Sequence, residues 1–223
     1  VMRLVGDRTK SIIDVGCGAG TFLALMLREG CCAEGVDVSA EQIRNAHAVL
    51  GNLGLSLNAA RVGSAGDLER EGRRFGVATL MDVIEHLDEP VQTLATVRNI
   101  LEPGGRLVVS VPADPSLYDD RDRAFGHRRR YDEATLRAQI EEAGFEIKLV
   151  WRWNFLGWLQ RYVNTKVLRR KAVHYEFRHS DRLLARMVNR VLRAYFLAVE
   201  NHVRPPKGMS LIAVACRVRS EKW

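Results

Sequence analysis

Hydrophobic and polar positions follow two alternating patterns along the first 150 residues. Short runs rich in β-branched and aliphatic residues predict strands, and longer segments with apolar residues every three or four positions predict helices. Strands are expected at 11–15, 33–39, 57–63, 76–83 and 106–112, and helices at 21–30, 40–54 and 90–105. Parallel strands need crossover connections of this kind, so the alternation predicts an α/β fold with helices on both faces of a parallel sheet.

The pattern changes in the C-terminal third. A helix and then a strand are expected within 134–153, and a last strand at 210–218, with helical patterns at 155–171 and 181–203 between these two strands. Such an interval is too long for a plain loop, so we expect a helical insertion. The expected units are a core of 1–152 and 208–223 and a helical cap of 153–207.

Aromatic residues and cations gather where this insertion begins. The aromatic residues are Trp151, Trp153, Phe155, Trp158 and Tyr162, and the cations are Arg161, Lys166, Arg169, Arg170 and Lys171. Aromatic anchors beside cations suit a helix at a membrane interface or a lid over a greasy substrate. Packing of one helix face would produce the same stripe. Three interpretations stay open: packing, peripheral membrane contact through 151–171, and a pocket lid.

Composition indicates a globular protein with an anionic partner. The 223 residues carry a formal net charge of +7, and 47% are hydrophobic. This charge suits nucleic acid, a membrane surface or an acidic substrate. The four cysteines show neither a disulfide framework nor the spacing of a zinc site, and no apolar run resembles a signal or membrane span. We therefore expect a cytoplasmic protein with reduced thiols; a segment before the first strand is either missing here or never existed.

The clearest candidate site is IIDVGCGAG at 12–20, where a strand leads into a turn with Gly16, Gly18 and Gly20. Glycines let the backbone approach a ligand, and the amides that open the next helix can face it. The turn differs from the G-x-G-x-x-G fingerprint of dinucleotide sites, and Asp14 would repel a pyrophosphate. The stretch predicts a small ligand that is positively charged or lacks phosphates. Asp37, which ends the second strand, suits ribose hydroxyls.

Five stretches occur in an order and spacing that resemble a known family. They are DVGCGAG, GVDVS, MDVIEHL, LEPGGRLVVSVP and EEAGFE. Together they resemble the class I S-adenosylmethionine-dependent methyltransferases, above all the small-molecule subgroup with the ubiquinone-pathway O-methyltransferases. The resemblance covers about 10–150 and the last strand. It implies a Rossmann-like, mostly parallel sheet of seven strands in which the last strand is antiparallel.

The same resemblance implies S-adenosylmethionine as the cofactor and S-adenosylhomocysteine as the product. Asp14 would bond the methionine ammonium, directly or through water, and Asp82 would lie beside the methionine end of the cofactor. The backbone of Gly16, Cys17 and Gly18 would pass beside the cofactor, while the Cys17 thiol would only pack.

The nucleoside half of the cofactor is expected on the next two strands. By the resemblance, Asp37 would hold the ribose and Val38 would flank the adenine. The family usually meets the adenine amino group with an acid after strand three, where this chain has Ser64. Either Ser64 and the Ala65 amide take that role or Asp67 reaches in; Asp67 is otherwise a solvated loop carboxylate.

Methyl transfer from a sulfonium needs alignment, exclusion of water and, for a hydroxyl acceptor, a base. His86 follows the fourth strand, at the edge where ligands bind in open α/β sheets, and is the candidate base. Glu85 is the alternative base. The alternative to a catalytic role for His86 is a structural one, in which it caps the turn that follows. The resemblance adds that some relatives in the quinone pathway use acids at this position with a divalent cation, but the sequence alone establishes no metal site and none is assigned.

A second candidate stretch is FGHRRRYD at 125–132, which follows a loop-like, acidic segment. In many similar methyltransferases this segment lies over the active site. His127, Arg130 and Tyr131 are candidate substrate contacts that would clamp a carboxylate or phosphate of the acceptor. Three adjacent arginines cannot all face one way, so one or two are expected to turn inward. The alternative is a solvated basic loop that pairs with Asp119, Asp120 and Asp122.

Function is expected to be methyl transfer to a small or lipid-like acceptor, at oxygen. A nucleic-acid methyltransferase would fit the charge, but the Asn/Asp-Pro-Pro-aromatic motif of base-amine enzymes is replaced by MDVIEH. Nor is there an appended recognition motif of the usual kinds. A non-catalytic cofactor-binding or partner subunit is the third alternative, because the cofactor residues argue for binding and do not prove turnover.

Overall fold

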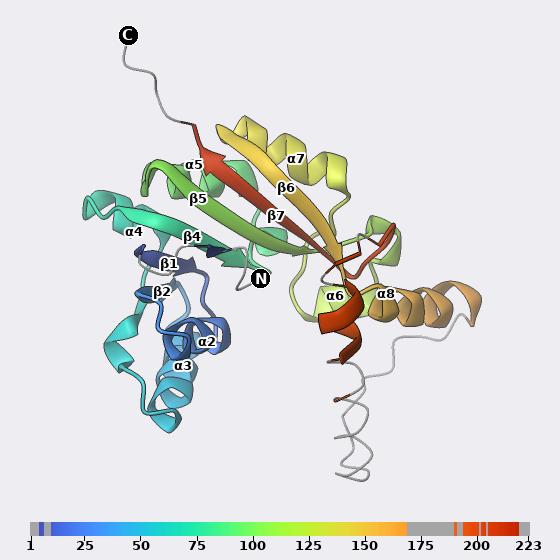
Figure 1. Ribbon diagram of the computed structural model, residues 1–223, viewed down its shortest axis with the longest axis horizontal. Coiled ribbons are helices and arrows are strands. Elements are labelled where there is room, and N and C mark those ends of the chain that lie inside the picture. Colours follow the sequence, from blue (N-terminus) through green and yellow to red (C-terminus); the bar gives the residue numbers. More distant parts are fainter. Residues whose placement is uncertain are drawn as a thin grey trace.

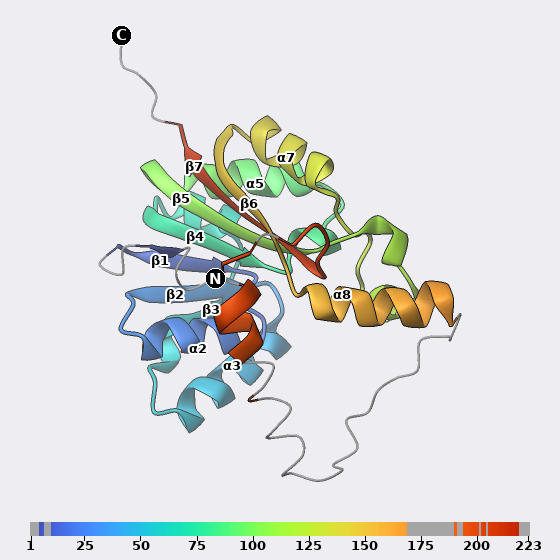
Figure 2. The same ribbon diagram turned by 45° about the vertical axis from the view of Figure 1, so that its right-hand side comes forward.

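The computed structural model describes residues 5–6, 10–168, 190, 194–200, 202–203 and 205–218, which build one seven-stranded sheet with helices on its faces (Figures 1 and 2). The strands are β1 (Ile12–Val15), β2 (Ala33–Asp37), β3 (Ala60–Val62), β4 (Phe75–Met81), β5 (Leu101–Pro112), β6 (Phe145–Trp153) and β7 (Ser210–Arg217). The helices are α2 (Thr21–Arg28), α3 (Ala40–Asn52), α4 (Ala65–Arg70), α5 (Pro90–Asn99), α6 (Asp120–Ala124), α7 (Glu133–Glu142) and α8 (Phe155–Tyr162).

The sheet has the strand order β3-β2-β1-β4-β5-β7-β6. Strands β1 to β5 pair in parallel, and β7 inserts between β5 and β6 antiparallel to both. The predicted sheet with an antiparallel last strand is therefore confirmed. The strand order reverses between β1 and β4, and ligands bind in open α/β sheets at the carboxyl ends of strands beside such a reversal.

Two apolar cores lie on opposite faces of the sheet. On one face Leu68, Leu94 and Leu136, from α4, α5 and α7, pack with the strands. On the other face Met26 and Leu50, from α2 and α3, do the same. The helical periodicity predicted from the sequence places these residues inward, and Figure 1 shows the two helical layers with the sheet between them.

The insertion between β6 and β7 begins with α8 and continues as a π-helical turn at Val163–Val167. A second π-helical turn, Phe196–Glu200, lies beside its start. The buried carboxylate of Glu200 accepts hydrogen bonds from the amides of Asn154 and Phe155, both at 2.7 Å, and so closes the first turn of α8. Most of the predicted helix at 181–203 lies outside the described residues.

Two stretches differ from the sequence prediction. The helix expected at 90–105 ends at Asn99, because Pro103 and Gly104, with φ of +75°, belong to an irregular start of β5. The loop-like segment after β5 contains the short helix α6. Asp119 and Asp122 form a reciprocal capping box at its start.

Candidate cofactor and active site

The glycine turn joins β1 to α2 at the carboxyl edge of the sheet. Gly16, Gly18 and Gly20 all have positive φ, at +73°, +52° and +73°. A Cβ on Gly16 would lie 2.7 Å from a methyl of Val83, so Gly16 lets the turn pack against the loop after β4. A Cβ on Gly18 would meet no described atom within 4 Å. The turn is thus closed toward β4 at Gly16 and open to a ligand at Gly18.

Asp37 ties the glycine turn to the end of β2. Its Oδ2 accepts a hydrogen bond from the Gly18 amide at 2.9 Å, and its Oδ1 accepts one from the Ser39 amide at 2.9 Å. Each carboxylate oxygen keeps a second lone pair. The neighbouring Val38 is 77% exposed, which leaves an apolar surface at this edge. Cys17 is buried, with its sulfur 2.9 Å from the position of a Cβ on Gly35, as a packing role predicts.

Asp14 lies fully buried beneath this turn. The Thr79 hydroxyl donates a hydrogen bond to its Oδ1 at 2.6 Å. Burial raises the pKa of Asp14 to about 7, the Thr79 bond opposes that rise, and the charge of Asp37 adds to it. A buried carboxylate with one neutral donor has strong affinity for a cation that reaches it.

The residues expected at the adenine amino group form the start of α4. Ser64 and Asp67 make a capping box, with the Ser64 amide 2.8 Å and the Ser64 hydroxyl 2.6 Å from Asp67 Oδ2. Asp67 also pairs with Arg70. The Asp67 carboxylate and the Ser64 hydroxyl are both engaged in this cap, and the residue that meets the adenine amino group stays a prediction.

Asp82 follows β4 with φ of +55°, a strained conformation for a residue with a side chain. The Ser110 hydroxyl donates to Asp82 Oδ1 at 3.2 Å, and the Asp82 amide donates to the Ser110 carbonyl at 2.9 Å. Burial raises the pKa of Asp82 above its usual value. The strained residue turns the chain sharply into the 3₁₀ turn Ile84–His86.

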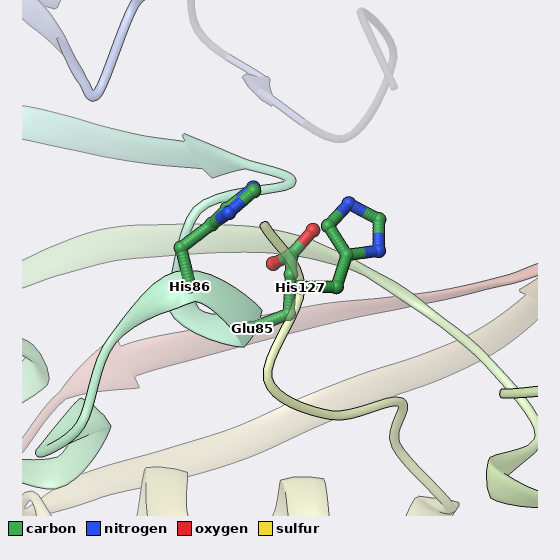
Figure 3. Close-up of side chains that lie close together, drawn as sticks. All are labelled: Glu85, His86 and His127. Atoms are coloured by element: carbon green, nitrogen blue, oxygen red, sulfur yellow. The ribbon is translucent and has the colours of Figure 1, made fainter. Parts of the chain in front are cut away.

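Glu85, His86 and His127 meet at this turn. One ligand-type atom from each lies within 4.8 Å of the others, and Figure 3 shows the three side chains gathered together. Glu85 is 0% exposed, and neither of its oxygens has a hydrogen-bond partner among the described residues. Burial raises the pKa of Glu85 to about 8. Partial burial lowers the pKa of His86. The neutral imidazole, which can accept a proton as a base must, is therefore favoured over the charged form.

The segment 125–132 crosses over this cluster. The Arg128 amide donates to the Glu85 carbonyl at 2.9 Å, and Arg128 and Arg129 donate to the carbonyls of His86 and Leu87 at 2.8 and 2.9 Å. These bonds fix the segment on the turn after β4. They also explain the burial of Glu85, which its local sequence does not reveal.

Arg130 turns inward, as expected for one member of the arginine run. Its Nε lies 2.9 Å from both oxygens of the buried Asp122, and its Nη1 donates to the Ala113 carbonyl. Tyr131 is fully buried, and its hydroxyl donates to the Ile84 carbonyl at 3.3 Å. Both side chains have structural partners, so His127 is the residue of the predicted clamp that reaches the cluster.

Asp122 is a site residue that the sequence analysis placed only in a solvated loop. It also lies 3.1 Å from Nδ1 of His127 and accepts a hydrogen bond from Arg161 of α8 at 2.8 Å. Hydrogen bonds from Arg130 and the Asp119 amide hold the pKa of Asp122 below its usual range, although burial alone would raise it. The Asp-x-x-Asp capping pattern at 119–122 is the sequence signal that could have located it.

The aromatic stripe of the insertion packs in part against the core. Trp158 stacks with Phe155 and Tyr162, and its indole donates to Asp114 at 2.8 Å. Trp153 contacts Phe196 with ring centroids 4.9 Å apart. These contacts support the packing interpretation for the first turns of α8. Within the described part of the chain, no helix is long and apolar enough to cross a membrane.

These features define a class of protein: an α/β domain with a glycine turn after β1, an aspartate at the end of β2 and titratable groups where the strand order reverses. A model of the family described as "Methyltransferase domain" matches residues 1–150. The chain therefore belongs to this methyltransferase domain family. The resemblance to class I S-adenosylmethionine-dependent methyltransferases is confirmed, and with it S-adenosylmethionine as the cofactor of the family.

Relatives and solved structures agree with this assignment. The chain is 30% identical to a ubiquinone biosynthesis O-methyltransferase of Serratia proteamaculans over 49% of its own length and 46% of the relative. It is 35% identical to one of Cereibacter sphaeroides over 44% and 40%. The chain thus spans less than half of the length of either relative.

Among solved structures, the fold is similar to a SAM-dependent methyltransferase from Archaeoglobus fulgidus, with a TM-score of 0.58, 17% identity and coverage of 93% and 86%. It is also similar to phosphoethanolamine N-methyltransferase 2 of Haemonchus contortus in complex with S-adenosyl-L-methionine. That match has a TM-score of 0.62, 14% identity and coverage of 98% of this chain and 51% of the other. At these identities the likeness concerns the fold alone.

Proposed function

We propose that this chain transfers the methyl group of S-adenosylmethionine to a hydroxyl of a small or lipid-like acceptor. The observation that carries the proposal is the bond from the Gly18 amide to Asp37, at the same edge as the buried Asp14. Asp14 would meet the cofactor ammonium, Asp37 the ribose and exposed Val38 the adenine. The printed names of the 30–35% identical relatives support oxygen as the methylated atom.

His86 is the base in this proposal. Its Nδ1 lies 3.1 Å from the Gly126 carbonyl, which leaves Nε2 for the acceptor hydroxyl. The hydroxyl oxygen would attack the methyl carbon, the sulfur would keep the electron pair of the broken bond, and Nε2 would take the proton. His127 would contact the acceptor, and Ser110 and Val83 would keep Asp82 and the glycine turn in place.

The insertion supports a greasy acceptor in this proposal. Leu156, Leu159, Val163 and Val167 are exposed at helical spacing on α8 and the turn after it. An apolar stripe beside the active edge suits a lipid-like acceptor or contact with a membrane surface. Sedimentation with vesicles of neutral and of anionic lipids measures that contact, and Leu159→Glu is the variant expected to reduce it.

Calorimetric titration tests the cofactor half first. We expect micromolar binding of S-adenosylmethionine and S-adenosylhomocysteine and no binding of NAD. Transfer of radiolabelled methyl to phenolic and prenylated compounds then tests the acceptor half, with His86→Ala expected to lower turnover and keep cofactor affinity. Absence of cofactor binding would refute the proposal. Binding without turnover on any acceptor would favour a non-catalytic module, and salt-dependent RNA affinity a nucleic-acid enzyme.

A further inference from the structure

We infer that Asp122 is a positioning residue for His127, and that this carboxylate–imidazole pair receives the proton which His86 removes from the acceptor. The inference rests on the proposed function, in which His86 is the base. It adds a destination for the proton and gives the segment after β5 a part in the reaction. The sequence does not indicate this pair, because Asp122 belongs to an acidic stretch that resembles a solvated loop.

The Asp122 carboxylate is buried and surrounded by hydrogen-bond donors. Its Oδ2 accepts hydrogen bonds from Nε of Arg130 at 2.9 Å, from Arg161 at 2.8 Å and from the Asp119 amide at 3.0 Å. Its Oδ1 accepts from Arg130 and faces Nδ1 of His127 at 3.1 Å. The two guanidinium groups and the amide favour the ionised carboxylate, which can only accept hydrogen bonds.

Both imidazoles are fixed in the same tautomer by their partners. Nδ1 of His86 lies 3.1 Å from the Gly126 carbonyl oxygen, as Nδ1 of His127 lies 3.1 Å from Asp122. Because both partners only accept, Nδ1 carries the proton in each neutral ring, and Nε2 keeps a lone pair that can take another. The partner of His86 is neutral and that of His127 is charged. The imidazolium form is therefore stabilised more at His127.

The two rings are close enough to exchange a proton through one water. They meet edge to face, with centroids 4.8 Å apart, and a ring nitrogen of each lies within 4.8 Å of the other (Figure 3). Two hydrogen bonds of about 2.8 Å through one oxygen atom span that gap. The water would take the proton from Nε2 of His86 and give one of its own to Nε2 of His127. His127, whose side chain is 17% exposed, can then release the proton to solvent.

Two other carboxylates lie near the rings. Asp82 accepts a hydrogen bond from the Ser110 hydroxyl, and the buried Glu85 accepts none among the described residues. In the part of the chain that the structure describes, Asp122 is the carboxylate that lies within hydrogen-bond distance of an imidazole nitrogen. A charge-assisted hydrogen bond stabilises an imidazolium more than a carboxylate without that contact does. The proton is thus expected at His127.

Long-range ¹H–¹⁵N correlation spectra show which ring nitrogen of a histidine carries the proton, and His127→Ala identifies the signal. We expect the Nδ1–H tautomer for neutral His127 in the wild type. In Asp122→Asn the three donors at Oδ2 would hold the amide oxygen there. The amide nitrogen would then donate to Nδ1, and His127 would change to the Nε2–H tautomer. Asp120→Asn, at an exposed acid of the same helix, is the matched control and should keep the wild-type tautomer.

Transfer of radiolabelled methyl to the phenolic and prenylated compounds measures the effect on the reaction. We expect Asp122→Asn and His127→Ala each to lower kcat by about 100-fold, with the affinity for S-adenosylhomocysteine unchanged. Added imidazole should restore part of the kcat of His127→Ala, because it can take the proton in place of the missing ring. A merely structural role for His127 would give no such rescue. Asp120→Asn should turn over as the wild type does.

Titration with S-adenosylhomocysteine shows whether each variant is folded. If Asp122→Asn does not bind it, His127→Ala with added imidazole is the deciding variant. An Nε2–H tautomer of His127 in the wild type, a wild-type kcat in Asp122→Asn, or no rescue of His127→Ala would overturn the inference and leave the proposed function standing. Absence of turnover by the wild type on every acceptor would instead refute the proposed function, and the proton transfer with it.

Discussion

Replacing Asp14 by Asn is expected to make the protein more stable and a weaker binder of its cofactor. Asn has nearly the same shape, and its Oδ1 can still accept the hydrogen bond that Thr79 donates at 2.6 Å. The substitution therefore removes a buried negative charge and little else. Without cofactor that charge opposes folding, and in the proposed function it would face the methionine ammonium once the cofactor is bound.

The magnitude follows from the pKa of Asp14, which is about 7 in the folded chain against an ordinary 3.8. A difference of about three pKa units corresponds to about 4 kcal/mol of unfolding free energy. An acid whose pKa is raised by folding binds its proton more tightly in the folded state than in the unfolded state. The contribution of Asp14 to the free energy of unfolding is thus most favourable below pH 3.8, declines as the pH rises to about 7, and is constant above that.

Urea unfolding of the wild type and Asp14→Asn between pH 5 and pH 8.5 measures this contribution as a difference. We expect Asp14→Asn to gain stability relative to the wild type as the pH rises, up to about 4 kcal/mol above pH 7. Asp88→Asn, which changes an exposed carboxylate, is the control and should give a small difference that varies little with pH. A variant less stable than the wild type at pH 8 would refute the burial argument.

Calorimetry of cofactor binding completes the test. We expect Asp14→Asn to bind S-adenosylmethionine about 10- to 150-fold more weakly, which corresponds to the loss of a charge-assisted hydrogen bond of about 1.5–3 kcal/mol. Near pH 7 the wild type should also release a proton on binding, because the ammonium favours the ionised carboxylate. Titration in buffers with different ionisation enthalpies detects that proton. Equal affinity of the two proteins would refute the placement of the ammonium.

Three further substitutions test other parts of the site. Asp37→Ala should weaken S-adenosylmethionine binding by roughly 1–3 kcal/mol, and an unchanged dissociation constant in calorimetry would contradict the ribose assignment. Asp122→Ala should lower the unfolding free energy measured in urea by about 3–5 kcal/mol, because Arg130 would stay buried without its partner. A loss below about 1 kcal/mol would show that the Arg130 guanidinium becomes hydrated in the variant. Ser64→Ala should cost about 1 kcal/mol through loss of the α4 cap, measured by urea unfolding, and an unchanged midpoint would argue against that cap.

The periodicity of hydrophobic residues was sufficient to predict the layers of the fold, because most strands and helices are long enough to show it. The short helix α6 has five residues, fewer than two helical turns, so no hydrophobic period could reveal it. The antiparallel direction of β7 came from the resemblance, and its position between β5 and β6 came only from the structure, since pairing partners are not encoded in the local pattern of a strand.

The shared edge of the expected cofactor residues was easier to predict than the surroundings of the expected acceptor residues, for a physical reason. Asp14 lies near the end of β1, the glycine turn follows β1 and Asp37 ends β2, so their common edge follows from the order of the elements. The surroundings of Glu85 depend instead on contacts with Arg128 and His127, which lie far along the chain. The sequence MDVIEHL would be the same with Glu85 buried or exposed.

The bond from Arg161 to Asp122 bears on how this protein could be re-engineered. Helix α8 opens the insertion, which under the proposed function is the segment to exchange when a different acceptor is wanted. Arg161, however, also bonds Asp119, and Asp122 orients the imidazole of His127. A chimera that imports a foreign insertion without an arginine at this position would therefore lose the contact that holds Asp122, and with it the orientation of His127. The insertion cannot be treated as an interchangeable cassette.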